Sequence, residues 1–334
     1  MKILITGATG FIGSFIVEES LKRGNETWAG VRKTSSMKFL PDSAIKTIDL
    51  PYSDKEKMVG MLTGQKAQHG KWDVIIHNMG LTKCENKSDF DRVNFDYTRN
   101  FILALQEADM VPEQFVYMSS LSAFGSGNPA SLEEIKLNDV PVPDTLYGKS
   151  KLKAEEFIQS LPGFPYTILR PTGVYGPREK DYFVMLQTLQ RHLNPAIGFK
   201  PQYITFIYVK DLVKAIFLSI EKKAIGKAYF VADGDVWTSD EYADLVKKEL
   251  GIKWAIPVKV PCMLVKALAY SLDTVGGWFG KTPTLNKDKY SILSALNWKC
   301  EVGALNKDLG FEPDYHLQQG LRECIEWYRK EKWL

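Results

Sequence analysis

The stretch TGATGFIG, which occupies Thr6–Gly13, lies between two patterns that decide the fold. The apolar run Lys2–Thr6 before it predicts a strand, and residues 14–23 after it have helical periodicity and are closed by Gly24. A strand, a glycine-rich turn and a helix in this order form the first half of a βαβ unit. The beginning of the sequence therefore predicts the first strand of a parallel sheet.

Three glycines set the expected shape of this stretch. Gly7 permits a tight turn, Gly10 lets the backbone approach a pyrophosphate, and Gly13 allows the helix to sit close to the strand. The first turn of the helix then directs free N–H groups and its positive dipole end at the phosphates. Glycines also mark ordinary turns, but the strand–turn–helix context favours dinucleotide binding. The expected cofactor contacts are Gly7, Thr9, Gly10, Phe11, Ile12 and Gly13.

Short β-branched runs alternate with helical stretches through the first half of the chain, which is typical of a parallel sheet covered on both faces. Further strands are expected at 27–32, 44–50, 74–77, 115–118 and 166–170, long helices at 90–109 and 146–160, and a loop at 125–144. A strand at 204–209, a helix at 211–221 and a strand at 228–231 indicate a return to the sheet.

The predicted fold class is α/β, a Rossmann doubly wound parallel sheet with a smaller C-terminal substrate lobe. Residues 1–175 form the expected NAD(P)-binding domain, to which residues 203–234 return. Residues 176–202 and 235–334 form the expected substrate-binding lobe.

The composition excludes several classes of protein. The 334 residues are 45% hydrophobic and 25% charged, and the net charge of +3 is spread without long blocks, so no nucleic-acid partner is expected. Four scattered cysteines without a CxxC pair predict neither a disulfide framework nor a metal site. The first residues lack a secretory signal pattern, and we therefore expect a cytoplasmic protein.

The end of the second expected strand bears on the choice of nicotinamide cofactor. An acidic residue there would bind a ribose 2′-hydroxyl, whereas a basic residue accommodates a 2′-phosphate. This chain has Arg32 and Lys33, which favour NADP, with NAD as the alternative if the two residues are only a solvated loop. Asp49 is placed to accept a hydrogen bond from the adenine amino group, or it is a turn residue.

Tyr147 and Lys151 lie four positions apart in the helix expected at 146–160, so both side chains share one face. A free tyrosine has a pKa near 10, and a neighbouring ammonium group lowers it toward the range of an acid/base catalyst. The same spacing often marks a solvated helix face. Together with the glycine turn, however, it predicts proton exchange between Tyr147 and a substrate oxygen while the nicotinamide exchanges a hydride.

Polar residues that follow other elements add to this set. Ser119 and Ser120 end the strand expected at 115–118, where a hydroxyl can polarise the same substrate oxygen, although either serine could be a strand cap. Asn94 interrupts a helical pattern and is a candidate to hold a backbone group or a water beside Lys151.

Seven motifs occur together along the chain: TGATGFIG, IIHNMG, VNFDYTRN, VYMSSLSAFG, YGKSK, RPTGVYGPR and FIYVKDLVKAI. In order and spacing, this set resembles the extended short-chain dehydrogenase/reductases of the NAD-dependent epimerase/dehydratase superfamily, over nearly the whole chain. The resemblance implies a catalytic set of Ser120, Tyr147 and Lys151, in which the spacing to Gly125 selects Ser120 over Ser119.

The same resemblance extends the expected cofactor site. It implies that Lys151 also binds the nicotinamide ribose and that His77 lies beside the cofactor rather than on a metal ion. Leu50, Pro171 and the catalytic Tyr147 complete the cofactor-binding residues that we expect. The long helices at 90–109 and 146–160 suggest a homodimer, by analogy with the family.

Departures from the family pattern bear on the substrate. Met79 stands where a small alanine is usual, and Phe124 stands where sugar-nucleotide enzymes often keep a tyrosine. Ile204 and Thr205 stand where those enzymes carry a basic residue, without which a diphosphate loses charge-assisted hydrogen bonds. By contrast, the apolar stretch at 261–279 and the ending LNKDLGFEPDYHLQQGLRECIEWYRKEKWL are similar to the dihydroflavonol-reductase-like and 3β-hydroxysteroid-dehydrogenase-like branch. Members of that branch act on alcohols and ketones of apolar, often cyclic molecules.

The leading hypothesis is hydride transfer between the cofactor and a secondary alcohol or ketone of a small-molecule substrate. The alternative is a sugar-nucleotide epimerase or dehydratase that retains its cofactor. A third hypothesis, a non-catalytic nicotinamide-binding sensor, is less favoured because such relatives commonly lose the tyrosine or the lysine that this chain keeps.

One apolar segment, residues 261–279, raises the question of a membrane contact. Lys266 and Asp273 interrupt it, whereas a spanning helix needs about 20 nearly uncharged residues. We expect a helix in the core or over an apolar pocket, with peripheral membrane contact as the less favoured alternative.

Overall fold

A computed structural model of the chain describes residues 1–40, 44–278, 283 and 285–334. These residues form two compact units. The first consists of Met1–Ala123, Leu146–Arg170 and Val213–Tyr229, and the second consists of Phe124–Thr145, Pro171–Leu212 and Phe230–Leu334. Each unit is therefore assembled from segments that are far apart in the sequence.

The first unit is built on a seven-stranded sheet with the strand order β11-β6-β5-β4-β1-β2-β3. The order reverses between β1 and β4, and in doubly wound sheets ligands bind outside the carboxyl ends of the strands at such a point. Strands β1 to β6 pair in parallel, so the predicted Rossmann sheet is confirmed. The strands are β1 (Lys2–Thr6), β2 (Glu26–Gly30), β3 (Lys46–Ile48), β4 (Val74–His77), β5 (Gln114–Met118), β6 (Tyr166–Pro171) and β11 (Lys227–Val231).

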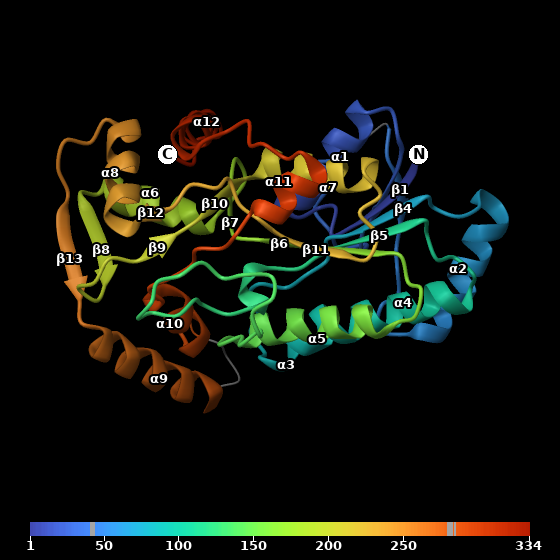
Figure 1. Cartoon of the computed structure of the whole chain (residues 1–334), viewed down its shortest axis with the longest axis horizontal. Coiled ribbons are helices and arrows are strands. Elements are labelled where there is room, and N and C mark those ends of the chain that lie inside the picture. The colour runs from blue at the N-terminus through green and yellow to red at the C-terminus, as the bar shows by residue number, and fades with distance from the viewer. Residues whose placement is uncertain (41–43, 279–282, 284) are drawn as a thin grey trace. The chain divides into compact units, whose positions relative to one another are not determined.

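Helices cover both faces of this sheet (Figure 1). On one face lie α1 (Phe11–Lys22) and α7 (Val209–Glu221), and on the other lie α2 (Lys55–His69), α4 (Tyr97–Glu107) and α5 (Leu146–Ser160). The second group packs on the sheet through a shared apolar core that includes Met58, Leu62, Phe101, Phe115 and Ala154. Because both faces are covered, strands such as β4 and β5 are buried along their whole length.

The helix expected at 90–109 is not continuous. It consists of α3 (Ser88–Phe90), a π-helical segment (Asp91–Asp96) and α4. Asn94 lies in the π-helical segment and is fully buried. Single π-helical turns inside helices are frequent at functional sites, because the wider turn re-aims a side chain.

The part of the second unit that the structure describes contains three two-stranded sheets. They pair β7 (Gly173–Tyr175) with β10 (Phe206–Tyr208), β9 (Tyr203–Ile204) with β12 (Trp237–Thr238), and β8 (Leu193–Ile197) with β13 (Ile256–Val260). The single strand expected at 204–209 is thus split, and neither part joins the large sheet. Thr205 lies at the break, where its hydroxyl donates to the carbonyl of Trp298 at 2.7 Å.

The described residues of the second unit also form six helices: α6 (Asp181–Gln190), α8 (Ser239–Leu250), α9 (Cys262–Trp278), α10 (Lys287–Ser294), α11 (Gly303–Leu309) and α12 (Leu317–Lys330). Its apolar core joins α6, α8 and α12 to β10 through residues such as Leu186, Phe206, Tyr242 and Leu321. Gly320 of α12 is closely packed, because a Cβ atom there would overlap the ring of Tyr175.

Helix α9 accounts for most of the apolar segment at 261–279, of which residue 279 lies outside the described residues. Most of the described surface of α9 is exposed, because only Val265, Ala269 and Asp273 are buried among its described side chains. The expectation of a helix in the core was therefore wrong. Throughout the described parts of the chain, no helix combines the length and the apolar character needed to cross a bilayer.

Candidate active site

The glycine turn is packed so closely that two of its positions exclude a side chain. Gly7 has a φ of +65°, and a Cβ atom there would come within 2.8 Å of the carbonyl oxygen of Asn78. A Cβ atom at Gly13 would overlap the carbonyl oxygen of Gly7, so the start of α1 can approach β1 only without a side chain. The turn is closed by a hydrogen bond from the Gly10 amide to the Gly7 carbonyl at 3.1 Å.

Helix α1 begins without a capping side chain. Its N-cap is Gly10, which is exposed, and its first turn has no acidic residue. Thr9, Phe11 and Ile12 flank this residue and are half-buried. Amide groups at the start of a helix, left without a side-chain acceptor, suit a phosphate group. The chemistry of the cradle therefore fits the pyrophosphate of a dinucleotide.

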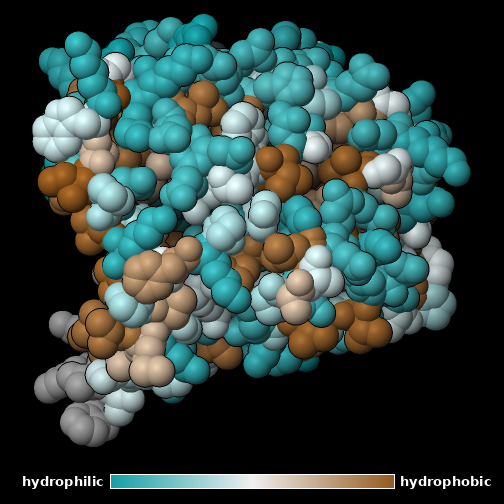
Figure 2. Space-filling model, turned by 60° about the vertical axis from the view of Figure 1, so that its left-hand side comes forward, coloured by the Kyte–Doolittle hydropathy of each residue, from teal (hydrophilic) through white to brown (hydrophobic). Residues whose placement is uncertain are grey.

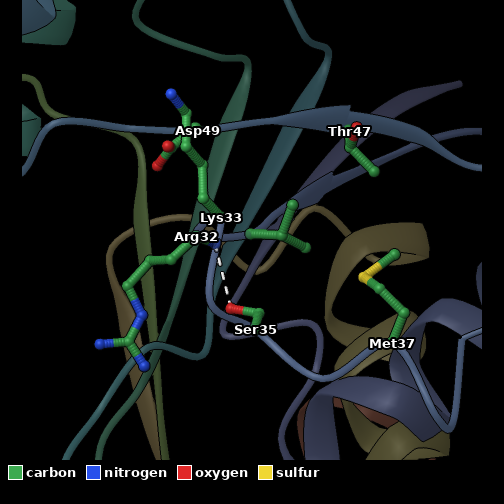
Figure 3. A pocket seen from close by; sticks show the side chains of 7 residues that line it. Arg32, Lys33, Ser35, Met37, Thr47 and Asp49 are labelled. Atoms are coloured by element: carbon green, nitrogen blue, oxygen red, sulfur yellow. Dashed lines mark hydrogen bonds between the residues drawn. The ribbon is translucent and has the colours of Figure 1, made fainter.

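A pocket of about 350 Å³ lies beyond the end of β2, and Figure 3 shows the residues that line it. Arg32 and Lys33 leave the chain in different directions, and the backbone amide of Arg32 donates to the hydroxyl of Ser35 at 3.1 Å. Asp49 lines the same pocket, together with Val31, Met37 and Thr47. The buried side chain of Leu50 follows Asp49 and lies 3.6 Å from the position of a Cβ atom at Gly30.

Tyr147 and Ser120 come together at the carboxyl end of β5. Burial raises the pKa of Tyr147 to about 12, and a hydrogen bond with the Ser120 hydroxyl lowers it. The sequence led us to expect a lowered pKa from Lys151, but here the loss of water around the phenol dominates. Ser120 also accepts a hydrogen bond from the Ser122 amide at 3.1 Å.

Lys151 is buried one helical turn from Tyr147. Its ammonium group donates to the carbonyl oxygen of Met118 at 2.8 Å and lies 4.9 Å from the ring centroid of Tyr117. Burial lowers the pKa of Lys151 to about 8, and the carboxylate of Glu155 raises it. The group is therefore charged at neutral pH but close to its titration range.

Glu155, Arg170 and Ser119 form a buried polar cluster that the sequence analysis missed. The guanidinium of Arg170 donates to both carboxylate oxygens of Glu155, at distances from 2.7 to 3.1 Å. Ser119 donates its hydroxyl to the same carboxylate, whereas its neighbour Ser120 meets Tyr147. A sequence signal existed, because positions 147, 151 and 155 are spaced by four and share one helix face.

Asn94 connects the π-helical segment to the loop after β4. Its side-chain oxygen accepts from the Leu81 amide at 2.7 Å, and its nitrogen donates to the Leu81 carbonyl at 3.0 Å and to Ser150 at 2.9 Å. At the adjacent Gly80, a Cβ atom would lie 3.0 Å from the Lys151 ammonium, so a larger residue there would crowd the ammonium group. Asn94 thus holds the backbone that borders Lys151.

His77 and Pro171 are both buried at strand ends. The two ring nitrogens of His77 lie 3.0 Å from the hydroxyls of Thr6 and Thr98, and burial lowers the pKa of the ring to about 3. The ring is therefore neutral and already engaged by protein hydroxyls. Pro171 ends β6 and has a backbone without an N–H donor.

The model of the NAD dependent epimerase/dehydratase family matches residues 3–232, which is more than half of the chain. The chain belongs to this family. The match covers the glycine turn and both ends of α5, so the cradle and the Tyr147–Lys151 pair lie within the matched residues.

Curated relatives of this family member are named for more than one reaction class. The chain is 26% identical to a 3-beta-hydroxysteroid dehydrogenase of Mycolicibacterium neoaurum, over 98% of this chain and 91% of the relative. It is also 26% identical to a UDP-glucose 4-epimerase of Vibrio cholerae, over 97% of this chain and 94% of the relative. Both functions expected from the sequence, dehydrogenase and epimerase, thus occur among its relatives.

Solved structures agree with the fold. The UDP-glucose 4-epimerase of Thermotoga maritima, solved with UDP-glucose, superimposes with a TM-score of 0.78 at 20% identity, covering 99% of this chain and 100% of that chain. The dTDP-glucose 4,6-dehydratase of Bacillus anthracis, solved with NAD, gives a TM-score of 0.76 at 17% identity, covering 100% of this chain and 98% of that chain.

The structure shows where Met79 and Phe124, the two residues that the sequence analysis singled out, lie. Met79 is half-buried, and its amide donates to the Thr6 hydroxyl at 3.2 Å. Phe124 is buried, with its ring centroid 5.0 Å from that of Phe230. Phe124 thus packs on another aromatic ring of the second unit.

Proposed function

We propose that the chain is an NADP-dependent oxidoreductase that transfers a hydride between the cofactor and a secondary alcohol or ketone of an apolar or cyclic molecule. The observation that carries this proposal is the hydrogen bond between Tyr147 and Ser120, one helical turn from the buried ammonium of Lys151. The three side chains can bind, polarise and protonate one carbonyl oxygen.

The chain's own residues would hold the cofactor at three places. The cradle at Gly7, Gly10 and Gly13 and the start of α1 would bind the pyrophosphate. Arg32 and Lys33 would pair with a 2′-phosphate, with Asp49 at the adenine, and Lys151 would donate to the nicotinamide ribose. When bound there, the nicotinamide supplies or accepts the hydride.

In the direction of reduction, Tyr147 gives its phenolic proton to the substrate oxygen as the hydride reaches the carbonyl carbon. Its raised pKa keeps the phenol protonated at neutral pH, which suits an acid. Ser120 donates a hydrogen bond to the same oxygen. The charge of Lys151 stabilises the phenolate that remains, which then recovers a proton from solvent. Asn94 holds the loop beside Lys151 and acts as a positioning residue.

The preference for an apolar substrate rests on the second unit. Ile204 and Thr205 offer no cationic partner for a diphosphate, and the Thr205 hydroxyl is engaged by the protein. The second candidate, a sugar-nucleotide epimerase with retained cofactor, is favoured by the full-length similarity to UDP-glucose 4-epimerase.

We also propose a cytoplasmic homodimer that pairs α4 and α5 of two copies. Light scattering in solution would test whether the chain is a dimer.

Cofactor titration followed by turnover separates the two candidate functions. The purified chain is titrated with NADPH and with NADH, and then incubated with a panel of apolar cyclic ketones and a panel of nucleoside-diphosphate sugars. A net change in nicotinamide absorbance with a ketone supports the oxidoreductase. Conversion of a sugar nucleotide without net absorbance change, by protein that retains its cofactor, overturns it in favour of the epimerase.

A further inference from the structure

Among its described side chains, helix α9 turns the larger apolar ones toward solvent. Val265, Ala269 and Asp273, spaced by four residues, form its buried stripe. Met263, Leu264 and Leu268 are 80%, 62% and 53% exposed. A helix that only covers a core places its leucines inward, whereas α9 exposes Leu264 and Leu268.

The apolar surface continues along the segment that leads into α9. Trp254 is 58% exposed, and Ile256 and Val258 of β13 are 54% and 40% exposed. Figure 2 shows apolar surface gathered low on this side of the molecule, at the height at which Figure 1 places α9. We define the α9 face as Trp254, Ile256, Val258, Met263, Leu264, Leu268 and Tyr270. An exposed apolar patch of this kind marks an interaction surface.

Charge on the same segment indicates what covers the α9 face. Between Gly251 and Thr274 the exposed charged residues are Lys253, Lys259 and Lys266. The one acidic residue in that stretch is Asp273, whose side chain is 2% exposed. Lys259 has an acidic neighbour on α8, the exposed Asp240 at 3.7 Å. Lys253 and Lys266 of this segment therefore lie beside the apolar side chains, as does Lys287 of α10, whose ammonium is 4.7 Å from the ring centroid of Tyr270.

These charges argue against a second copy of the chain as the occupant. A two-fold interface pairs a surface with itself, so it would bring the lysines of the two copies together. A bilayer that contains anionic lipid offers both the opposite charge and an apolar interior. Exposed aromatic rings such as Trp254 and Tyr270 also suit the level of the lipid headgroups.

We propose that the α9 face is a peripheral membrane-binding surface for anionic bilayers. Helix α9 lies in the plane of the interface, with Met263, Leu264 and Leu268 among the acyl chains and Lys253 and Lys266 at the headgroups. The ammonium of Lys266 lies 5.7 Å from the ring centroid of Tyr270, which places a cation and an aromatic ring at the edge of the apolar side chains. This proposal is independent of the reaction that the chain catalyses.

Vesicle flotation with the full chain tests the proposal. One vesicle preparation is pure phosphatidylcholine, and the other contains phosphatidylglycerol as well. We expect the wild type to float with the anionic vesicles and to be released as salt screens the lysines. The double variant Leu264→Gln/Leu268→Gln should lower the bound fraction by about tenfold, because two apolar anchors are lost while helix propensity is kept. Lys253→Gln/Lys266→Gln should remove the preference for anionic vesicles.

The matched control is Val140→Gln/Val142→Gln, which changes two valines that are 82% and 71% exposed in a loop of the same unit. This variant should float like the wild type, and circular dichroism should show that all variants are folded. Failure of the wild type to bind either vesicle overturns the proposal, as does equal flotation of Leu264→Gln/Leu268→Gln. Light scattering that shows a dimer lost only in the leucine variant would assign the α9 face to a second copy instead.

Discussion

Arg170 donates to both carboxylate oxygens of Glu155, and the two side chains are 6% and 1% exposed. Glu155 follows Lys151 by one turn of α5, so this ion pair lies next to Lys151. The carboxylate raises the pKa of Lys151, whereas burial lowers it. The pair therefore links the packing of β6 against α5 to the charge of the proposed active site.

Replacing Glu155 with glutamine should affect both stability and the pH profile. Arg170 would be left buried without its anion, which costs about 3–5 kcal/mol of unfolding free energy. The pKa of Lys151 should fall, so the limb of the pH–rate profile that reports this group should move to lower pH. Glu156→Gln, which changes the exposed neighbour, should do neither. A pH profile that stays in place while stability falls would limit Glu155 to a structural role.

Removing the hydroxyl of Tyr147 tests the proposed acid directly. Tyr147→Phe should lower kcat by about 10²–10⁴-fold, because the substrate oxygen loses its proton donor. Cofactor affinity should change little, since the cradle and Lys151 remain. Stopped-flow measurement of hydride transfer, with a separate cofactor titration, distinguishes the two effects. Turnover at the wild-type rate would contradict the assignment.

A substitution in the glycine turn can be matched with a control substitution at a glycine of α2. A Cβ atom at Gly13 would overlap the Gly7 carbonyl oxygen, so Gly13→Ala should abolish cofactor binding and destabilise the first unit. Gly64 lies inside α2, and a Cβ atom there would meet nothing within 4 Å. Gly64→Ala should therefore raise the free energy of unfolding by roughly 0.5–1 kcal/mol and leave cofactor affinity unchanged. Calorimetric titration with NADPH and thermal unfolding measure both quantities.

The choice of cofactor depends on the pocket beyond β2. Arg32→Ala/Lys33→Ala should weaken NADPH binding by about ten- to a hundredfold, because a charged hydrogen bond contributes about 1.5–3 kcal/mol. Affinity for NADH, which lacks the 2′-phosphate, should be nearly constant. Lys22→Ala, at a lysine whose side chain is 81% exposed on α1, is the control for a general loss of positive charge. An equal effect on both cofactors would contradict the preference for NADP.

Asp233 predicts a pH dependence of stability in the second unit. Burial raises the pKa of Asp233 to about 7, and among the described residues its Oδ2 atom has no hydrogen-bond partner. The folded chain keeps this proton up to about pH 7, whereas the unfolded chain loses it near pH 4. This contribution to stability is therefore complete below about pH 4 and lost as the pH rises through 7.

Asp233→Asn should remove that loss of stability. Relative to the wild type, the variant should gain ~1–3 kcal/mol between about pH 4 and pH 8, measured by denaturant unfolding. Asp240→Asn, at an exposed aspartate, should show no such gain. Parallel stability curves for the wild type and Asp233→Asn would mean that this carboxyl titrates normally.

Periodicity predicted the first unit well, and the reason is local. Residues 2–6, 74–77 and 146–160 were assigned from apolar runs and helical spacing, and the elements begin and end at those residues. Elements that depend on distant partners were missed or merged. Helix α2 buries few residues, so its sequence has little apolar periodicity. The π-helical segment interrupts a helix that the sequence predicted as continuous. The strand expected at 204–209 breaks at Thr205, where a side chain from elsewhere in the chain forms a hydrogen bond with the Thr205 hydroxyl.

The glycine turn at 6–13 and the spacing of Tyr147 and Lys151 were visible in the sequence because their geometry is set within one turn and one helix. Only the tertiary structure decided what surrounds them. It turns Ser120 toward Tyr147 and Ser119 toward Glu155, buries the phenol so that its pKa rises, and exposes the leucines of α9. Local spacing is fixed by backbone geometry, whereas hydration and charge at a side chain depend on segments brought together by folding.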